Sequence, residues 1–336
     1  MEVVVHYREM AFMGFAEVLA NLSTITKKIK YCKQDIQEYK PDVVVLIDYA
    51  GFNLRIAKFA KAQGLKVYWY ISPKVWAWNQ SRALKLKANI DRMFVILPFE
   101  KEFFQKYDWK VDYVGNPVLD AVKAHQVDQE FLLRNNINSS QPLVALLPGS
   151  RKQEVKLIIP LMTDVVRQNP LIQFGVATVD NLPKEYYHGL NELPNVTFIN
   201  DATYDLLHYS VAAIVTSGTA TLETALFNVP QVVVYRTSSI SYLIAKNLIR
   251  VPYISLVNLI ASKEVVKEMI QQKANGKDVS AELNMILEND QYREKMMNGY
   301  KEIRDFLDTG SASENTAIMM LEYLQSSNLQ IEQFSN

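Results

Sequence analysis

The feature that most constrains the fold is a regular alternation of short apolar segments with amphipathic ones. Apolar runs bounded by turn residues are typical of strands buried in a parallel sheet, and the segments between them have helical periodicity. The first half of the chain carries four such strand signals, at 42–48, 66–72, 92–98 and 111–117. The first, DVVVLID, has the composition of a strand covered on both faces.

The pattern restarts after a polar stretch. Five further strand signals follow, at 143–150, 172–178, 196–200, 212–218 and 232–237, and the chain is rich in helical segments after residue 264. We therefore predict an α/β protein with two Rossmann-like domains, each a parallel sheet with helices on both faces. Ligands bind at the carboxyl ends of strands in such sheets, so we expect the active site in the cleft between the domains.

The predicted domain boundaries follow the polar stretch that interrupts the alternation of strand and helix signals. Residues 1–122 form the N-terminal domain, 123–141 the linker and 142–310 the C-terminal domain. We expect a C-terminal helix over 311–336 to pack back on the N-terminal domain.

Composition excludes several classes of protein. The 36 basic and 36 acidic residues balance, so no global field attracts nucleic acid. The single cysteine rules out an internal disulfide framework and fits a reducing compartment. The four histidines are scattered without metal-ligand spacing, which predicts no metal site. No apolar run approaches the roughly 20 residues that cross a bilayer, so we expect a cytoplasmic protein, with peripheral membrane contact left open.

The segment ALLPGSR, residues 145–151, is the clearest chemical motif. A buried strand runs into Gly149 and Ser150, and a helix begins at once. Glycine lets a ligand approach the backbone, Ser150 is a good N-cap, and the first helical amides can face an anion. Arg151 adds a planar fork suited to phosphate oxygens. The alternative is a capped helix with a surface arginine.

The segment VTSGTATLETAL, residues 215–226, repeats this design. Ser217, Gly218 and Thr219 lie between a strand and a helix, which predicts a second anion-binding turn. Glu223 follows one helical turn later, within reach of a ribose diol, unless it is an exposed carboxylate that complements the helix dipole. Two such turns in one half favour a nucleotide diphosphate, although there is no Walker A or G-x-G-x-x-G motif.

Three further segments contain candidate functional residues. Asp48 lies where the first strand ends, as a general base or as a simple turn aspartate. The loop SPKVWAWNQSR, residues 72–82, contains two tryptophans and an arginine. An apolar stripe precedes the lysines at 27, 28, 30 and 33, and is either a patch for an anionic membrane or a core helix. The stripe consists of Met10, Phe12, Met13, Phe15, Val18, Leu19 and Leu22.

The chain resembles the lipid-A-disaccharide synthase family, glycosyltransferases of the two-domain GT-B type. The motifs that carry the resemblance occur in the family's order from about residue 6 to the C-terminus. They are AFMGFAEVL, IDYAGFN, SPKVWAWNQSR, LPFEKEFF, YVGNPVLD, LLPGSRKQEV, TSGTATLETAL and SLVNLIASKEVVKE.

The resemblance implies a reaction. UDP-2,3-diacylglucosamine donates its sugar to the 6-hydroxyl of 2,3-diacylglucosamine 1-phosphate (lipid X), which forms a β-1,6 disaccharide with inversion and releases UDP. It also implies no metal or other cofactor, a place on the cytoplasmic face of the bacterial inner membrane, and no nucleic acid partner. A homodimer is left open.

The resemblance also implies roles for residues. Asp48 matches the family's essential aspartate and is the expected base, and Arg151 matches its key arginine and is expected to hold the diphosphate. Asn258 matches an asparagine near the donor. Residues 149–151 and 217–219, with Glu223, are the expected donor elements. Residues 10–30 match the membrane-facing patch, and Trp76, Trp78 and Arg82 are expected to line the acceptor side.

The resemblance implies that the family's opening strand, a GExSGD-type loop and a helix lie ahead of this chain's first residue. We therefore expect an incomplete N-terminal domain, and a chain that folds poorly or has little activity as given. Two alternatives stay open. One is another UDP-sugar GT-B enzyme, such as a lipid-linked cell-wall transferase or a UDP-GlcNAc 2-epimerase. The other is an inactive remnant that binds nucleotide-sugar or lipid.

Overall fold

The computed structural model describes residues 3–6, 22–180, 182–238, 242–243 and 251–334. The chain divides into two compact units. The first comprises residues 1–115 together with 310–336, and the second comprises residues 116–309.

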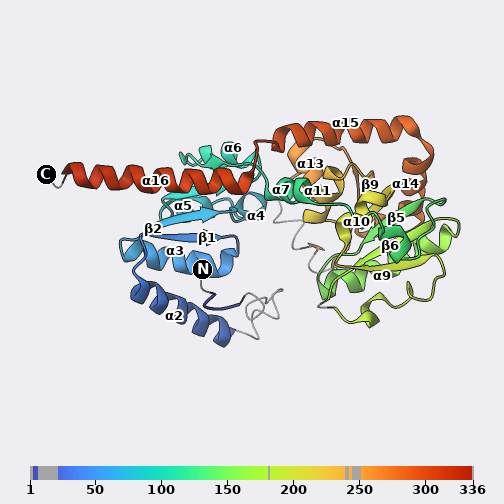
Figure 1. Cartoon of the computed structure of the whole chain (residues 1–336), viewed down its shortest axis with the longest axis horizontal. Helices are drawn as coiled ribbons and strands as arrows, with labels where there is room; N and C mark the ends of the chain where they lie inside the picture. The colour runs from blue at the N-terminus through green and yellow to red at the C-terminus, as the bar shows by residue number, and fades with distance from the viewer. Residues whose placement is uncertain (1–2, 7–21, 181, 239–241, 244–250, 335–336) are drawn as a thin grey trace. The chain divides into compact units, whose positions relative to one another are not determined.

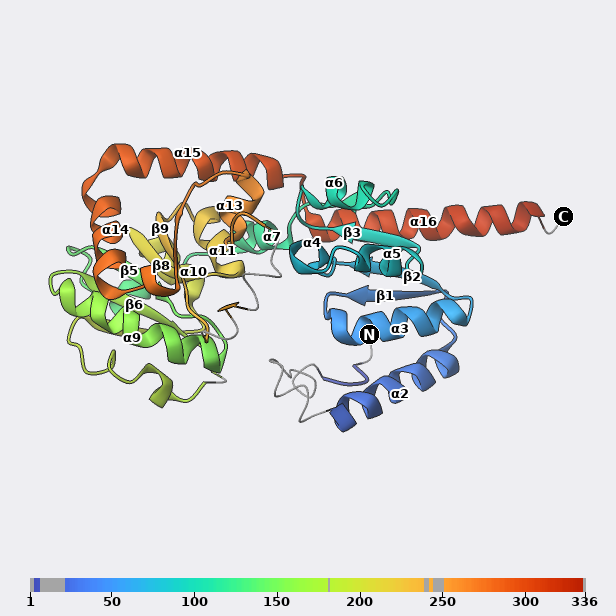
Figure 2. The same cartoon turned by 180° about the vertical axis from the view of Figure 1, so that it is seen from behind.

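The first unit is built on a four-stranded parallel sheet in the order β1-β2-β3-β4. The strands are β1 (Val43–Ile47), β2 (Lys66–Tyr70), β3 (Arg92–Val95) and β4 (Asp112–Tyr113). The helices are α2 (Leu22–Tyr39), α3 (Ala50–Ala62), α4 (Val75–Trp78), α5 (Arg82–Lys87), α6 (Glu100–Gln105) and α16 (Ala312–Phe334). In both views α3 lies against the sheet and α2 lies against α3 (Figures 1 and 2).

The C-terminal helix α16 belongs to this unit because it covers the other face of the sheet. Met319, Met320 and Tyr323 pack on a core cluster that includes Tyr68 and Phe94. The Arg92 guanidinium lies 3.7 Å from the centroid of the Tyr323 ring, and the Tyr323 hydroxyl donates to Asp112 Oδ1 at 3.2 Å. A chain segment more than 200 residues away in sequence thus covers one face of the sheet in the first unit.

Strand β1 differs from the expectation that both its faces are covered. Val44 and Leu46 are buried, but Val45 is 42% exposed and Ile47 is 58% exposed. The reason is position, since β1 lies at an edge of the sheet and only one of its faces is covered by the described residues. A continuous apolar run does not distinguish an edge strand from a central one.

The second unit contains a six-stranded parallel sheet in the order β10-β9-β8-β5-β6-β7. The strands are β5 (Leu143–Leu147), β6 (Gln173–Thr178), β7 (Val196–Asn200), β8 (Ala212–Thr216), β9 (Gln231–Tyr235) and β10 (Lys267–Ile270). The helices are α7 (Pro117–Ala124), α8 (Phe131–Arg134), α9 (Lys152–Gln168), α10 (Thr203–Tyr209), α11 (Thr219–Leu226), α13 (Leu256–Ala261), α14 (Gly276–Glu288) and α15 (Asp290–Leu307). Two short 3₁₀ helices span Lys184–Tyr187 and Gln271–Lys273.

The strand order of this sheet reverses between β5 and β8. From β5 the chain proceeds outward through β6 and β7, then returns to place β8 on the other side of β5. Every residue of β5 and β8 is buried, as expected for central strands. In open parallel sheets, the crevice outside the carboxyl ends of two such strands is where ligands bind.

The boundary between the units lies earlier than the predicted linker. The Asn116 side chain caps α7 by accepting from Val118 N at 3.0 Å, and α7 packs on α11 in the second unit. Residues 123–141 are likewise folded onto this unit, because Asp205 accepts from Asp128 N at 2.8 Å and contacts His125 Nε2 at 3.1 Å. Strand β10 was not predicted either, since Lys267 and Glu268 interrupt its apolar pattern.

Removing the Asp205 carboxylate should release the segment at residues 125–128. We expect Asp205→Ala to lower the free energy of unfolding by about 1–3 kcal/mol, because it leaves a half-buried backbone N–H without its acceptor. Urea denaturation measures the loss, with the exposed Glu130→Ala as the control. An unfolding midpoint equal to that of the control would show that Asp205 does not anchor this segment.

Candidate active site

Two strand–turn–helix junctions meet at the point where the second sheet reverses. Strand β5 ends at Leu147 and α9 begins at Lys152, while β8 ends at Thr216 and α11 begins at Thr219. The two strands pair in parallel with Leu147 opposite Val215, so their turns lie side by side. Helices that begin at such turns direct unpaired backbone N–H groups toward the crevice, which suits an anion.

The first junction holds an exposed arginine beside a glycine that the backbone requires. Gly149 has φ +101°, and a Cβ there would lie 2.9 Å from Glu154 Oε2. Arg151, rather than Ser150 as expected, occupies the N-cap position of α9, in an extended conformation. Its Nη1 lies 2.7 Å from Glu154 Oε1. The guanidinium is therefore accessible and oriented by one carboxylate.

A tyrosine from the neighbouring strand β9 joins this charged group. Burial raises the pKa of the Tyr235 hydroxyl, the Glu154 carboxylate raises it further, and the Arg151 guanidinium lowers it. Thr216, at the end of β8, is buried, and its Oγ1 has no hydrogen-bond partner among the described residues. Glu154 and Thr216 lie next to or within the two motifs, but their residue types alone did not mark them as functional. Tyr235 reaches the turn only because β9 pairs with β8 in the folded sheet.

The second junction presents an open backbone. Gly218 caps α11 with φ 167°, an extended conformation, and a Cβ there would meet nothing within 4 Å. Ser217 is fixed on both sides, since its N–H donates to Val234 O at 3.0 Å and its Oγ donates to Ile254 O at 2.8 Å. The absence of a side chain at Gly218 thus keeps the entrance to the helix N-terminus clear.

Glu223 is not the exposed carboxylate of the simpler interpretation. It is partly buried and accepts a hydrogen bond from the Tyr204 hydroxyl at 2.9 Å. Burial raises the pKa of Glu223, and the hydrogen bond from Tyr204 opposes that shift. The Tyr204 ring packs on His125 and Phe227, with centroids 5.5 and 5.0 Å away.

Asn258 has a role that differs from the one expected. Its side chain is 0% exposed. Its Nδ2 donates to Val266 O and to Glu268 Oε1, both at 2.9 Å. Its Oδ1 accepts from Val265 N at 2.8 Å and from Val266 N at 3.0 Å. Both ends of this amide are hydrogen-bonded inside the protein, so Asn258 orders this loop.

Glu268 connects that loop to the second junction. Its carboxylate accepts from Ile254 N, from Ser255 N and Oγ, and from Asn258 Nδ2, at 2.8–3.2 Å. The carbonyl of Ile254 in turn receives the Ser217 hydroxyl. The motif SLVNLIASKEVVKE therefore acts as a support behind the turn at Ser217.

In the first unit, Asp48 lies in a left-handed turn at the end of β1. Asp48 and Tyr49 have φ +44° and +43°. The Asn53 side chain holds this turn by donating to Ile47 O at 3.0 Å and to Asp48 O at 2.8 Å. Asp48 is exposed. Two consecutive left-handed residues other than glycine are uncommon, and such backbone clusters at functional sites.

A third unusual residue lies at the end of the next strand. Ile71, directly after β2, has φ +66°, which a β-branched side chain disfavours strongly. The Trp69 indole N–H donates to Ile71 O at 3.0 Å, and Ile71 N donates to Phe94 O at 3.0 Å. The carboxyl edge of this sheet therefore carries strained backbone at the ends of both β1 and β2.

The tryptophan loop separates into a buried and an exposed part. Trp76 is buried, and its Nε1 donates to Glu100 Oε1 at 3.1 Å. It therefore does not line an open surface, which corrects its expected role. Trp78 is 47% exposed, and the Arg82 guanidinium lies 5.1 Å from its ring centroid. Trp78 and Arg82 thus present an exposed aromatic ring beside a cation.

The membrane-contact prediction falls largely outside the described residues. Met10, Phe12, Met13, Phe15, Val18 and Leu19 belong to the undescribed segment 7–21, and only the backbone of Leu22 is described. The stripe thus stays a prediction. The described ranges contain no helix long and apolar enough to cross a membrane, and no group of three or more residues suited to a metal ion.

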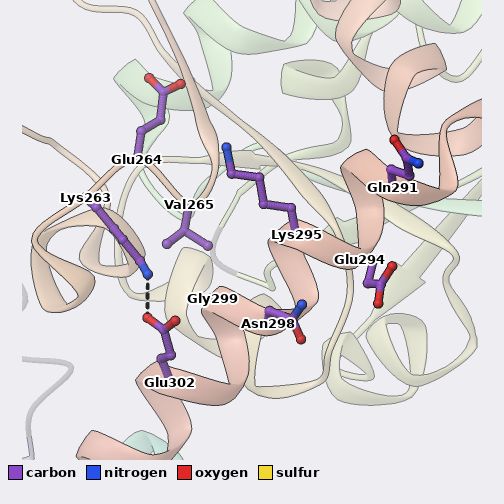
Figure 3. Close-up of a pocket in the computed structure, with 9 residues that line it drawn as sticks. All are labelled: Lys263, Glu264, Val265, Gln291, Glu294, Lys295, Asn298, Gly299 and Glu302. Atoms are coloured by element: carbon purple, nitrogen blue, oxygen red, sulfur yellow. Dashed lines mark hydrogen bonds and ion pairs between the residues drawn. The ribbon is translucent and has the colours of Figure 1, made fainter.

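A surface hollow of about 340 Å³ lies elsewhere on the second unit (Figure 3). It lies between α15 and the residues before β10, where Lys263 forms an ion pair with Glu302 at 2.6 Å. This is the amino end of β10, opposite the strand ends that bind ligands in parallel sheets. Its lining mixes lysines and glutamates, so we do not assign it to the active site.

The comparisons with known proteins match this architecture. The family model described as lipid-A-disaccharide synthetase matches residues 1–321. The chain belongs to this family. A lipid-A-disaccharide synthase of Syntrophus aciditrophicus is 39% identical over 326 residues, covering 95% of this chain and 85% of the relative. One of Geobacter metallireducens is 37% identical, covering 96% and 86%.

The family membership confirms the expected enzyme class, a glycosyltransferase. The solved UDP-GlcNAc 2-epimerase of Neisseria meningitidis has a TM-score of 0.65 at 16% identity, covering 93% of this chain and 83% of its own. At that identity the likeness shows the fold alone, and it confirms the expected GT-B architecture with two parallel-sheet domains.

The buried amide of Asn258 leads to a prediction. We expect Asn258→Ala to lower the free energy of unfolding by on the order of 3 kcal/mol, because several buried partners lose their hydrogen bonds together. Thermal unfolding measures it, with the exposed Asn298→Ala as a matched control. A variant that unfolds like wild type yet loses turnover would instead favour direct contact between Asn258 and the donor.

Proposed function

We propose that the protein transfers the sugar of UDP-2,3-diacylglucosamine to the 6-hydroxyl of 2,3-diacylglucosamine 1-phosphate (lipid X). The products are the β-1,6 disaccharide precursor of lipid A and UDP. The observation that carries the proposal is the pair of junctions at the reversal of the second sheet, with Arg151 exposed at one and Gly218 open at the other. Family membership supplies the substrate class.

The proposed reaction is a direct displacement. The acceptor O6 attacks the anomeric carbon and loses its proton to the Asp48 carboxylate. The bond from that carbon to the diphosphate oxygen breaks, and the electron pair leaves with UDP. Asp48 is suited to this role because its side chain is exposed and its backbone is held by Asn53.

The leaving diphosphate requires neutralisation. The proposal assigns this to Arg151 and to the amides that begin α9 and α11, since preorganised donors of this kind stabilise developing charge without rearrangement. Arg151 has to exchange its contact with Glu154 for phosphate oxygens. A metal ion has no assigned role, so turnover should persist with EDTA.

The remaining donor contacts follow the same junctions. Gly149 and Ser150 line the first turn, and Ser217, Gly218 and Thr219 line the second. Glu223 offers a carboxylate to the ribose diol, one helical turn further along α11. The acceptor is an acylated and phosphorylated sugar. Its apolar part suits the exposed ring of Trp78, and its phosphate suits the guanidinium of Arg82.

We propose that the protein works at the cytoplasmic face of the inner membrane, where its acylated substrates reside. Lys27 and Lys30 are exposed on the described helix α2, directly after the apolar stripe. Clustered lysines add affinity for anionic lipid surfaces.

Two substitutions test the two catalytic assignments. We expect Asp48→Asn to lower kcat roughly 10²–10⁴-fold, because asparagine tolerates the left-handed turn but accepts no proton. Arg151→Ala should lower kcat by about 10²–10³-fold. Turnover of UDP-2,3-diacylglucosamine and lipid X measures both. Asp42→Asn, at the other end of β1, and the exposed Arg134→Ala are the controls; wild-type rates in the Asp48 variant would remove the base assignment.

Vesicle sedimentation tests the membrane assignment. We expect the protein to pellet with vesicles that contain anionic lipid, and release to increase with salt as the charges are screened. Replacing Lys27 and Lys30 with glutamine should weaken pelleting more than replacing Lys85 and Lys87 on α5. Equal pelleting with neutral vesicles at high salt would contradict a role for the lysines.

A further inference from the structure

One buried carboxyl group in the first unit is not used by the proposed reaction. Glu100, the first residue of α6, is 2% exposed. It accepts hydrogen bonds from Ser72 Oγ, from Trp76 Nε1 at 3.1 Å, and from the backbone N–H groups of Ile96 and Leu97 at 3.2 and 2.9 Å. Burial raises its pKa, and the hydrogen bonds oppose the shift. No cation pairs with it among the described residues.

The donors to Glu100 come from two loops. Ser72 and Trp76 belong to the loop after β2, and Ile96 and Leu97 belong to the loop after β3. These strands are neighbours in the sheet, so Glu100 joins two adjacent loops at the carboxyl edge. A buried carboxylate without a cation is costly unless hydrogen bonds satisfy it, which ties the position of each loop to the other.

The tryptophan loop depends on this anchor for its orientation. Helix α4 has four residues, too few to be stable alone. The segment that leads into α4 begins at Ile71, and the disfavoured φ of this residue persists only where surrounding contacts hold it. The Trp76 and Phe99 rings pack edge to face with centroids 4.9 Å apart, which stabilises the position of Trp76 in addition to its hydrogen bond to Glu100. Within the same turn of helix, Trp78 is directed to solvent beside Arg82.

We propose that Glu100 is a positioning residue for the acceptor: by holding Ser72 and Trp76, it fixes the direction in which Trp78 and Arg82 are presented. This inference rests on the proposed function, since it names the acceptor as the ligand of the exposed pair. Glu100 touches neither substrate, so its loss should weaken acceptor binding and leave the donor unaffected.

Three variants of this chain separate the positioning role from folding. Trp76→Phe keeps an aromatic side chain but deletes the indole N–H together with one of the two fused rings, Ser72→Ala deletes one hydroxyl, and Glu100→Gln replaces an acceptor oxygen with a donor. In each we expect the acceptor KM to rise about tenfold, the size expected for one lost buried hydrogen bond, with the donor KM within twofold of wild type. Trp78→Ala should show the same selective effect.

The control is Ser280→Ala in the second unit, where Ser280 Oγ accepts from Asn169 at 2.6 Å in an equally buried setting. We expect it to lower stability and leave both KM values unchanged. Donor and acceptor KM values that rise together, or an acceptor KM unchanged in folded Trp76→Phe and Ser72→Ala, would overturn the proposal.

A second measurement does not depend on turnover. Of the four tryptophans, Trp69, Trp76 and Trp109 are buried and Trp78 is exposed, so acrylamide quenching reports on Trp78. Glu100→Gln should change the quenched fraction, and Ser280→Ala should not. If wild type neither binds UDP nor turns over UDP-2,3-diacylglucosamine and lipid X, the proposed function fails. Unchanged quenching in folded Glu100→Gln removes the positioning role in either case.

Discussion

Parallel pairing of the strands is the constraint on which the rest of the molecule depends. In each sheet it places all carboxyl ends at one edge, and the chain must return through a crossover connection before the next strand. In the second unit the order reverses between β5 and β8, which separates the helices that follow these strands. The junctions at Gly149 and Gly218 acquire their chemistry from that reversal, because two helix N-termini then face one crevice.

Two acidic residues organise the loops that this arrangement leaves at the strand ends. Glu268 ties Ser255 and Asn258 to the support of Ser217, and Glu100 ties Ser72 and Trp76 to the loop after β3. Both carboxylates accept several hydrogen bonds from uncharged donors. Networks of this kind define one arrangement well, because every partner left unsatisfied in a different arrangement would cost free energy.

Left-handed backbone also occurs at the strand ends of the first unit. Asp48, Tyr49 and Ile71 have positive φ at the ends of two neighbouring strands of the first unit. Each conformation is held locally, by Asn53 at the first position and by Trp69 at the second. The first of these turns presents the proposed base, so its geometry is set by the fold before any substrate arrives.

The sequence alone determined the parts of the protein that are contiguous along the chain. Local patterns and family motifs predict nine of the ten strands that the structure describes, the junctions at Gly149 and Gly218, and the placement of Asp48 and Arg151 at strand ends. Only the tertiary structure decided that Val45 and Ile47 are exposed, that residues 123–141 fold onto the second unit, that Asn258 and Trp76 are buried, and that Glu100 and Glu268 hold the loops. Burial and hydrogen-bond partners depend on segments that are distant in sequence, and a side chain's type does not reveal whether those segments cover it.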